Sequence, residues 1–316
     1  MQVFRHITSQ FSPTSVPTAA CAIAIGNFDG MHLGHQALLK KLTETAKALN
    51  LTSAVMTFEP HPREFFTPES APARLCSVRE KLEYFAAAGI DHVYVCGFNH
   101  RFAKVTAAEF MQNILRDALN AQAILVGEDF RFGAKRSGSI ADFVEAKFNL
   151  ISLPQVDLAI GNAAPSRVSS TRVRNALAAG KLQEAALLLG RPYSMSGKVV
   201  HGAKRGRQLG FPTANVHMRH ERPALTGVYA VKLDGRNSVA NLGVRPTIAG
   251  VPKLMLEVHV IDFNADLYGQ HVHVEFLYKI RDEMKFDSLD ALKAQIAIDK
   301  STARDFFASV ISTKSE

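Results

Sequence analysis

The chain has 316 residues, of which 47% are hydrophobic and 21% are charged, and its 37 lysines and arginines against 29 aspartates and glutamates give a formal net charge of +8. This length predicts about two domains, and the composition is that of a globular protein, which excludes a disordered tail protein or a collagen. The positive charge favours an anionic partner such as nucleic acid, a membrane surface or a nucleotide phosphate, but a merely basic soluble surface is an equal alternative.

The cysteines and the apolar runs indicate the cellular compartment of the protein. Cys21, Cys76 and Cys96 are odd in number and form no Cys-x-x-Cys pair, which favours reduced thiols over a disulfide framework or a zinc site. No apolar run approaches the ~18 residues of a membrane helix. The apolar segment 16–25 follows a polar stretch and precedes no small-residue cleavage site, so we interpret its second half as a strand and expect a cytoplasmic protein.

Short apolar runs alternate with amphipathic segments over residues 22–190. Between the runs, apolar side chains recur at helical spacing, as in 38–42, 82–85 and 110–115. This alternation predicts an α/β, Rossmann-like domain: a parallel sheet with helices on both faces, whose ligands bind beyond the C-terminal strand ends. The expected strands are residues 22–28, 53–58, 92–98, 123–127 and 150–153.

The pattern changes after Gly190-Arg191-Pro192, where we place the boundary between domains 1–190 and 191–316. Two expected helices, 172–179 and 182–189, precede it. Period-two alternation and the hairpin signal Asp234-Gly235 then predict a small antiparallel β-barrel, covered by a C-terminal helix over 288–310. The expected barrel strands are residues 196–200, 227–233, 238–242, 254–261 and 271–277.

The run Gly26–His35, GNFDGMHLGH, closes the first expected strand and opens the first expected helix. Glycine lets the backbone approach a ligand, and a helix start offers free N–H groups and a positive dipole end to phosphate. His32 and His35, one turn apart, can both donate hydrogen bonds there. Two histidines at this spacing are more often surface residues, but His-x-Gly-His directly after a first parallel strand resembles the signature of nucleotidyl transferases, which hold ATP for attack at its α-phosphate.

Three further segments of the first domain lie where such a sheet binds ligands. Asp129 belongs to 126–133, which follows an expected strand. Segment 168–174, VSSTRVR, opens a helix with three hydroxyls and two arginines, a terminus suited to phosphate, with an ordinary helix cap as the equal alternative. Segment 57–62, TFEPHP, adds an aromatic residue and a kinked loop, for which a simple turn is an equal alternative.

The second domain begins with a glycine- and cation-rich stretch, 197–210. Its glycines allow a mobile flap whose N–H groups wrap a phosphate, although a basic hairpin loop facing solvent or RNA is the alternative. The residues singled out in this flap are Lys198, Gly202, Gly206 and Gly210.

Three side chains after the flap carry oxygen atoms suited to phosphoryl chemistry. The Thr213 hydroxyl and the Asn215 carbonyl are hard ligands of the kind Mg²⁺ takes, but a turn containing an asparagine is the commoner origin of such a motif. Glu257 alternates with apolar residues along its strand, so the apolar face should be the core face and Glu257 should line the opposite one. A solvated glutamate is an equal alternative.

Together these segments resemble the prokaryotic bifunctional riboflavin kinase/FAD synthetase family. Segments 27–35, 58–62, 127–133 and 169–174 are similar to its N-terminal FMN adenylyltransferase module. The flap, the Pro-Thr-Ala-Asn motif, the strand glutamate and Asp-Leu-Tyr-Gly at 266–269 are similar to its riboflavin kinase module. The resemblance covers nearly the whole chain with both modules in the expected order, and it is weakest over 134–151.

The resemblance implies a two-step enzyme: the C-terminal module phosphorylates riboflavin with ATP to give FMN, and the N-terminal module transfers AMP from a second ATP to FMN, giving FAD and pyrophosphate. It implies Mg²⁺ as cofactor, bound with ATP by Thr213 and Asn215, and deprotonation of the ribityl 5′-hydroxyl by Glu257. The implied partners are small molecules, with neither nucleic acid nor a membrane expected, and the oligomeric state stays open.

The resemblance also implies the residues of the adenylyltransferase site. His32 and His35 would bind the ATP phosphates, Gly34 would clear room for the nucleotide, and segment 169–174 would clamp the departing pyrophosphate. The residues expected at ATP or its phosphates are Gly26, Asn27, Phe28, Asp29, Gly34, Asp129, Ser169, Ser170, Thr171 and Arg174, and those expected at the flavin are Phe58, Pro60 and His61.

A binding protein is the rival hypothesis, with a nucleotidyl transferase-like fold whose basic barrel merely holds flavin or RNA. Glu257 together with Thr213 and Asn215 argues against it, because a binding barrel needs neither a base nor two metal ligands.

Overall fold

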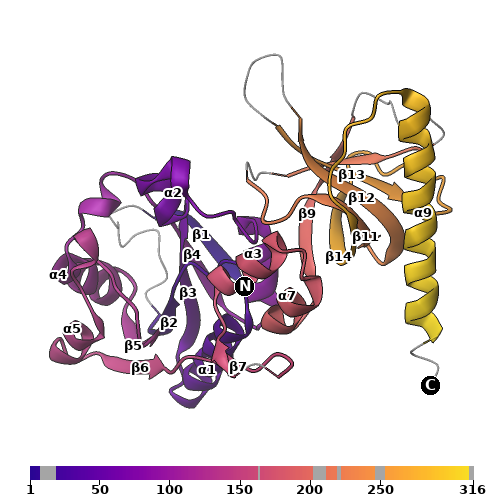
Figure 1. Ribbon diagram of the computed structural model, residues 1–316. Coiled ribbons are helices and arrows are strands. Elements are labelled where there is room, and N and C mark those ends of the chain that lie inside the picture. Colours follow the sequence, from indigo (N-terminus) through magenta and orange to yellow (C-terminus); the bar gives the residue numbers. More distant parts are fainter. Residues whose placement is uncertain (8–18, 163, 202–210, 219–221, 246–252, 313–316) are drawn as a thin grey trace. The chain divides into compact units, whose positions relative to one another are not determined.

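The computed structural model describes residues 1–7, 19–162, 164–201, 211–218, 222–245 and 253–312. The chain divides into two compact units, each of which is described here by itself (Figure 1). Unit 1 comprises residues 1–72 and 78–169, and unit 2 comprises residues 73–77 and 170–316. Among the described residues, no helix combines the length and the apolar character that crossing a membrane requires.

Unit 1 is built on a six-stranded parallel sheet, which confirms the predicted α/β fold. One strand was not expected: β1 pairs with β4 at the edge of the sheet, so the strand that leads into Gly26 is the second of the chain and not the first. The strands, in the spatial order β1-β4-β3-β2-β5-β6, are β1 (Gln2–Ile7), β4 (His92–Gly97), β3 (Thr52–Glu59), β2 (Cys21–Ile25), β5 (Ala121–Gly127) and β6 (Asn149–Leu153).

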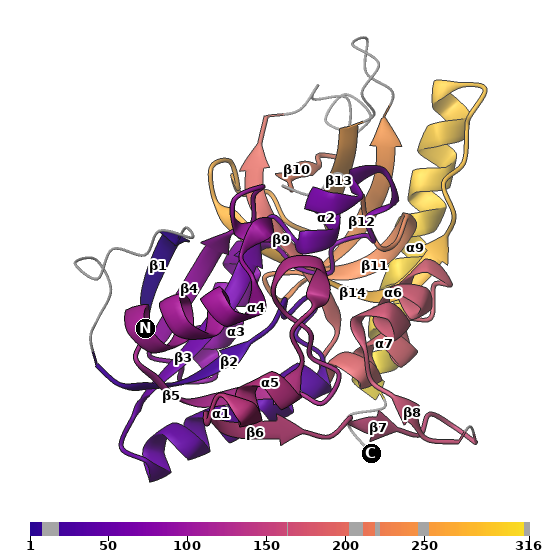
Figure 2. The same ribbon diagram turned by 90° about the vertical axis from the view of Figure 1, so that its left-hand side faces the viewer.

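Helices cover both faces of this sheet, as predicted (Figures 1 and 2). Side chains of β2 alternate between two cores: Ile23 packs with Phe110, and Ala24 packs with Leu42 and Phe85. The main helices are α1 (Leu33–Ala48) and α3 (Val78–Ala87), and the π-helix η4 (Phe110–Ala118) and α5 (Ile140–Glu145). The short elements are α2 (Pro62–Phe66), η2 (Pro68–Ser70), η3 (Phe102–Lys104), α4 (Ala107–Glu109), η5 (Ala134–Arg136), β7 (Asp157–Leu158) and β8 (Ser166–Arg167).

The strand order reverses between β2 and β5, and this reversal positions the ligand site. From β2 the chain moves outward through β3 to β4, and it then returns to the other side of β2 to form β5. In a parallel sheet the connections leave such a reversal point in opposite directions, which opens a crevice at the C-terminal strand ends. The loops that follow β2 and β5 therefore border the position at which sheets of this topology bind ligands.

Unit 2 contains a closed antiparallel barrel, which confirms the second predicted architecture. Asp234 (φ 44°) and Gly235 (φ 81°) form the expected hairpin between β11 and β12. Strand β10 was not expected. Around the barrel the strands are β10 (Ala214–His217), β13 (Lys253–Val260), β12 (Arg236–Arg245), β11 (Gly227–Leu233), β14 (His271–Arg281) and β9 (Tyr193–Val200).

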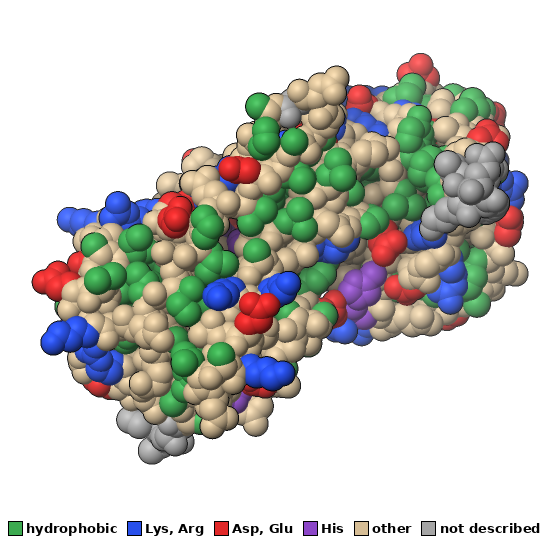
Figure 3. All heavy atoms as spheres, turned by 90° about the horizontal axis from the view of Figure 1, so that it is seen from below, with side chains coloured by type: hydrophobic (Ala, Val, Ile, Leu, Met, Phe, Trp, Pro, Cys, Tyr) green, Lys and Arg blue, Asp and Glu red, His purple; other side chains and the backbone are tan. Residues whose placement is uncertain are grey.

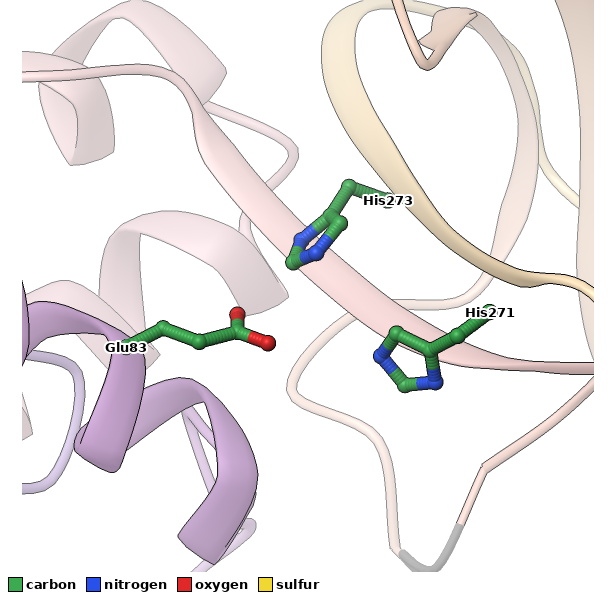
Figure 4. A group of neighbouring side chains, drawn as sticks. All are labelled: Glu83, His271 and His273. Atoms are coloured by element: carbon green, nitrogen blue, oxygen red, sulfur yellow. The ribbon is translucent and has the colours of Figure 1, made fainter.

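The barrel has an apolar interior and a partly covered exterior. Along β14, Val272 and Val274 are fully buried, whereas His271 and His273 occupy the other face with ring centroids 5.6 Å apart (Figure 4). The other side chain drawn there, that of Glu83, belongs to α3 of unit 1. Helix α9 (Leu289–Ser312) is the predicted C-terminal helix, and its Ala303 and Phe307 pack against Ala230 on the outside of the barrel.

Two helices that precede the predicted boundary pack with the barrel unit. Helix α7 (Leu182–Leu189) lies against β9 and β14, and α6 (Ser170–Ala178) lies against α7. The division into domains 1–190 and 191–316 stays a prediction. On the face drawn in Figure 3, Lys and Arg side chains are interspersed with Asp and Glu and do not gather in one continuous patch.

Candidate active sites

The loop after β2 has an unusual backbone. Phe28 (φ 49°) and Met31 (φ 46°) are in the left-handed region, where a non-glycine residue costs about 1–3 kcal/mol. Packing compensates for this strain, since the fully buried Phe28 ring lies edge-on to Phe85 with centroids 5.2 Å apart and also contacts the His35 ring at 5.3 Å. Strain that surrounding packing maintains is typical of ligand-binding loops.

His32 and His35 form a stacked pair at the start of α1. Their ring centroids are 3.7 Å apart with planes inclined by 17°. His32 caps the helix, because its Nδ1 accepts a hydrogen bond from the His35 backbone N–H at 3.4 Å. An accepting Nδ1 assigns the proton of the neutral His32 ring to Nε2, which is then a donor for a phosphate oxygen.

The electrostatic environment keeps His35 neutral. Burial lowers the pKa of His35 well below its ordinary value, and the nearby His32 and Lys81 lower it further. The Nδ1 atom of His35 is buried and has no hydrogen-bond partner among the described residues. This ring is thus available to a ligand as a neutral hydrogen-bonding group.

Gly34 sits where a side chain would crowd the His32 ring. A Cβ there would lie 3.2 Å from the His32 ring and 3.9 Å from the Val168 carbonyl oxygen. The geometry therefore suits the expected role of Gly34 in leaving space. It also brings Val168, the residue before Ser169, to the histidine loop within unit 1.

Two residues of the same loop place polar groups in the interior: the Asn27 side-chain oxygen and Asp29. The Asn27 carboxamide oxygen is buried and has no hydrogen-bond partner among the described residues, while the Asn27 backbone carbonyl accepts a hydrogen bond from Thr57 Oγ1 at 3.3 Å. Asp29 is 3% exposed. A buried acceptor without a protein partner points to a ligand or to water.

Asp129, in the loop after β5, is at the expected edge of the sheet but is already paired. Its carboxylate accepts a hydrogen bond from Arg167 Nη2 at 2.7 Å, and both side chains are largely exposed. An exposed ion pair of this kind is weak, so a ligand can replace it at little cost.

The residues expected at the flavin lie at the end of β3 and directly after it. The Phe58 ring contacts Phe98 and Phe102, with centroids 6.1 and 5.8 Å apart. His61 caps α2: its Nδ1 accepts a hydrogen bond from the Arg63 backbone N–H at 3.1 Å, so this nitrogen has a structural partner. Pro60, directly before it, is exposed.

The Ser-Ser-Thr segment crosses the division between the units. Ser169 is the last residue of unit 1, and Ser170 begins α6 of unit 2. In α6, Arg174 Nε donates a hydrogen bond to the Ala73 carbonyl at 2.6 Å, and Thr171 is exposed. The joint action of this segment with the histidines stays a prediction.

In unit 2, three polar side chains occupy neighbouring positions on adjacent strands. Glu257 on β13 is paired in register with Asn215 on β10 and with Asn241 on β12. Residues 256 and 258 are fully buried, whereas Glu257 is partly exposed, so the expected face of this strand is confirmed. Asn215 is 8% exposed.

The Pro-Thr-Ala-Asn segment is fixed to β13 by a histidine. His259 Nδ1 lies 2.9 Å from the Pro212 carbonyl oxygen, and burial lowers the pKa of His259 although this carbonyl acts in the opposite direction. Thr213 follows directly and is half-buried. Lys198 on β9 is exposed, and the expected flap glycines at 202, 206 and 210 lie outside the described residues.

The residue that sequence reasoning missed in this cluster is Asn241. A polar residue between the buried Ala240 and Leu242 could have indicated that it shares a face with other polar groups. Only the strand register shows that its neighbour is Glu257.

Comparisons with known proteins match both units. Residues 15–172 match the FAD synthetase family model, and residues 189–307 match the riboflavin kinase model. The chain is 46% identical over 302 residues to the bifunctional riboflavin kinase/FMN adenylyltransferase of Escherichia coli strain K12, covering 93% of this chain and 95% of that one. The chain belongs to the bifunctional riboflavin kinase/FMN adenylyltransferase family.

Two other known proteins also match this chain over most of its length. The family member from Pseudomonas fluorescens is 48% identical and covers 90% of this chain and 92% of its own. A crystal structure from Streptococcus pneumoniae, described as a macrolide-efflux protein, is 32% identical with a TM-score of 0.77 and covers 96% of this chain and 98% of its own. That description differs from the two family models, which match separate parts of this chain and agree with the relatives from E. coli and P. fluorescens.

Proposed function

We propose that this family member makes FAD from riboflavin in two ATP-dependent steps, one in each matched region. The observation that carries the proposal is that each family model covers one complete cluster of polar groups. The first covers the histidine loop and the second covers Asn215 and Glu257. The functional domains are proposed to be 1–190 and 191–316.

In the riboflavin kinase step, the ribityl 5′-oxygen attacks the γ-phosphorus of ATP. The new O–P bond forms as the bond to the β–γ bridging oxygen breaks, and ADP departs. We propose that Glu257 accepts the hydroxyl proton, because its carboxylate lies on the face of the strand opposite the buried core. Such reactions depend mostly on positioning and on charge neutralisation, because little covalent chemistry is left for the protein.

A magnesium ion fits the donors of this site. Thr213 and Asn215 offer a hydroxyl and a carboxamide oxygen, and Asn215 is nearly buried beside a carboxylate. Hard oxygen ligands with phosphate oxygens and water are the set that Mg²⁺ prefers. When bound, the ion would neutralise charge on the ATP phosphates. Lys198 and the flap glycines, the latter outside the described residues, are proposed to bind these phosphates.

In the adenylyltransferase step, a phosphate oxygen of FMN attacks the α-phosphorus of ATP, and the α–β bridging bond breaks to release pyrophosphate. The N-terminus of α1 and the rings of His32 and His35 lie together after β2 and can stabilise the charge that develops there. Asn27 offers a further buried oxygen, suited to a donor on the nucleotide.

The remaining assignments are proposals on the same basis. The phosphate-clamping role belongs to segment 169–174, the flavin contacts to Phe58, Pro60 and His61, and a place near the adenosine to Asp129. Small molecules are the proposed partners, without nucleic acid, and the cytoplasmic location stays a prediction.

The test is to incubate the purified chain with riboflavin, ATP and Mg²⁺ and to follow the products by liquid chromatography and mass spectrometry. The expected result is that FMN forms first and FAD follows, with one ADP and one pyrophosphate for each FAD. Flavin that binds tightly but is recovered unmodified would instead support the binding-protein hypothesis.

A further inference from the structure

A lysine is buried on the face of α3 that turns toward the histidine loop. Lys81 is 3% exposed, although it lies in a ten-residue helix of charged and apolar side chains. Phe85, one turn later, is fully buried against the Phe28 ring with centroids 5.2 Å apart. Because residues four apart share one face of a helix, the Lys81 side chain extends from the face that contacts the loop after β2.

The Lys81 ammonium lies near His35. Phe28 contacts both the Phe85 ring and the His35 ring, so it connects the two elements from which Lys81 and His35 extend. The positive charge of Lys81 is also one of the causes that lower the pKa of His35. The ring contacts of Phe28 thus bring α3 to the histidine loop, and the effect of Lys81 on His35 agrees with that placement.

Lys81 has no bonded counter-ion among the described residues, although the adjacent Glu80 is also 3% exposed. Within the part of the chain that the structure describes, Lys81 has neither a hydrogen bond nor an ion pair. Lysines are rarely so little exposed unless they are paired, which favours a ligand as the counterpart of this ammonium. The neighbouring His35 Nδ1 and Asn27 Oδ1 are also buried without protein partners, so several polar groups near this loop lack a counterpart.

We propose that Lys81 is an anion-binding residue of unit 1 whose ammonium contacts the phosphates of the nucleotide beside His35. The inference rests on the proposed adenylyltransferase function and adds a lysine ammonium to its site. A neutral histidine donates a hydrogen bond but carries no charge, whereas a lysine neutralises part of the charge of a triphosphate.

The competing explanation is that the Lys81 stem merely fills space, as the long methylene chains of lysines often do. The variant Lys81→Met keeps an unbranched stem and removes the charge, and Lys81→Arg keeps the charge. Lys47→Met, at an exposed position of α1 in the same unit, removes the same charge elsewhere and is the matched control.

The experiment measures FAD formation from FMN and ATP, together with pyrophosphate binding by calorimetry, in the full-length variants. We expect Lys81→Met to lower kcat/KM by about 10- to 100-fold and to weaken pyrophosphate binding, because a hydrogen bond to a charged group is lost. Lys81→Arg should keep part of the kcat/KM and part of the pyrophosphate affinity. Lys47→Met should have the wild-type kcat/KM and pyrophosphate affinity. The His35 titration, followed by NMR, should move to higher pH in Lys81→Met.

The inference is overturned if Lys81→Met folds and keeps the wild-type kcat/KM and pyrophosphate affinity. Phosphorylation of riboflavin by the same sample reports whether unit 2 is intact. If Lys81→Met does not fold, the side-chain ¹⁵N signal of Lys81 in the wild type, assigned by its absence in Lys81→Arg, must shift when pyrophosphate is added. If this signal does not shift, the contact is refuted. Failure of the wild type to adenylylate FMN would overturn the proposed function instead, and this signal would still test the anion site.

Discussion

Asn215 and Glu257 are directly opposite each other on the antiparallel strands β10 and β13. Side chains at such positions have Cβ atoms roughly 4.5–5.5 Å apart and share one face of the sheet. The Asn215 carboxamide, which can bind a metal ion, and the Glu257 carboxylate, which can accept a proton, are therefore neighbours, although 42 positions separate them in the sequence. The barrel closure holds this spacing, because both strands are paired on both sides.

Replacing Glu257 by glutamine should stop the kinase step selectively. The amide keeps the size of the side chain but cannot accept the ribityl proton, and loss of a general base costs roughly 10²–10⁴ in rate. FMN formation from riboflavin should fall by that factor, while FMN added from outside should still be converted to FAD. Both rates are measured by chromatography of the flavins.

A matched control for this variant is Glu275→Gln, which changes a partly exposed glutamate on β14 of the same barrel and should leave both steps unchanged. A Glu257→Gln enzyme with a wild-type kinase rate would remove Glu257 from the mechanism.

Replacing His35 by alanine should give the opposite result. Removal of one donor from a preorganised anion site costs roughly 10²–10³ in rate. FMN should accumulate from riboflavin because the adenylyl transfer is blocked, whereas its formation should proceed at the normal rate. Quantifying FMN and FAD over time checks this, and near-normal FAD formation would show that the histidine loop is not the adenylyltransferase site.

The lowered pKa of His35 should make unit 1 less stable in mild acid. The unfolded chain binds a proton at His35 below about pH 6.5, whereas the folded chain does not until a lower pH. Stability is therefore complete above that range and is lost as the pH falls toward the lowered pKa. In thermal unfolding from pH 7.5 to 5.5, His35→Gln should weaken the pH dependence by up to one proton, and an unchanged dependence would contradict this.

The Arg281–Asp299 ion pair should contribute strongly to the stability of unit 2. Arg281 donates to both carboxylate oxygens of Asp299, with Nη2 to Oδ2 at 2.8 Å, and the Asp299 side chain is only 4% exposed. Asp299→Ala leaves a largely buried guanidinium unpaired, which should cost about 3–5 kcal/mol in urea unfolding. Arg304→Ala breaks the exposed pair with Asp262 and should cost less than about 1 kcal/mol. Equal losses would contradict the role of burial.

A fragment that begins at Leu182 should fold and convert riboflavin to FMN. It retains α7, whose buried residues Leu182, Ala185, Leu188 and Leu189 pack with the barrel unit. A fragment that begins at Arg191 lacks this cover and should melt at least about 8 °C lower, because several leucine side chains lose their burial partners or are deleted. Circular dichroism melting measures the difference. A folded Leu182 fragment that binds riboflavin and ATP without turnover would favour the binding-protein hypothesis.

Sequence pattern predicts the buried elements well because burial on both faces requires continuous apolar runs. Strand β2, buried at every position, is the clearest case. Strand β1 escapes prediction because it is an edge strand with exposed residues such as Gln2 and Arg5. Strand β10 escapes because four residues are too few to show a period.

The candidate site residues also differ in how readily the sequence reveals them. His32, Gly34 and His35 are close in sequence, so a local motif reveals them. Asn241 depends on strand register and Lys81 on helix packing, and a charged residue among apolar helix positions is ordinarily assigned to the surface.

The closed barrel also determines where this protein is vulnerable to pairing with another copy of itself. The six described barrel strands are paired on both sides. Among the described strands of unit 1, the sheet ends in β1 and β6, and the outer N–H and C=O groups of an edge strand can recruit a further strand. Strand β1 carries Arg5, a charge of the kind that discourages such pairing, but β6 reads Asn-Leu-Ile-Ser-Leu and has none. At high concentration or during refolding, intermolecular β-pairing should therefore begin at β6, and a lysine introduced on its exposed positions should suppress it.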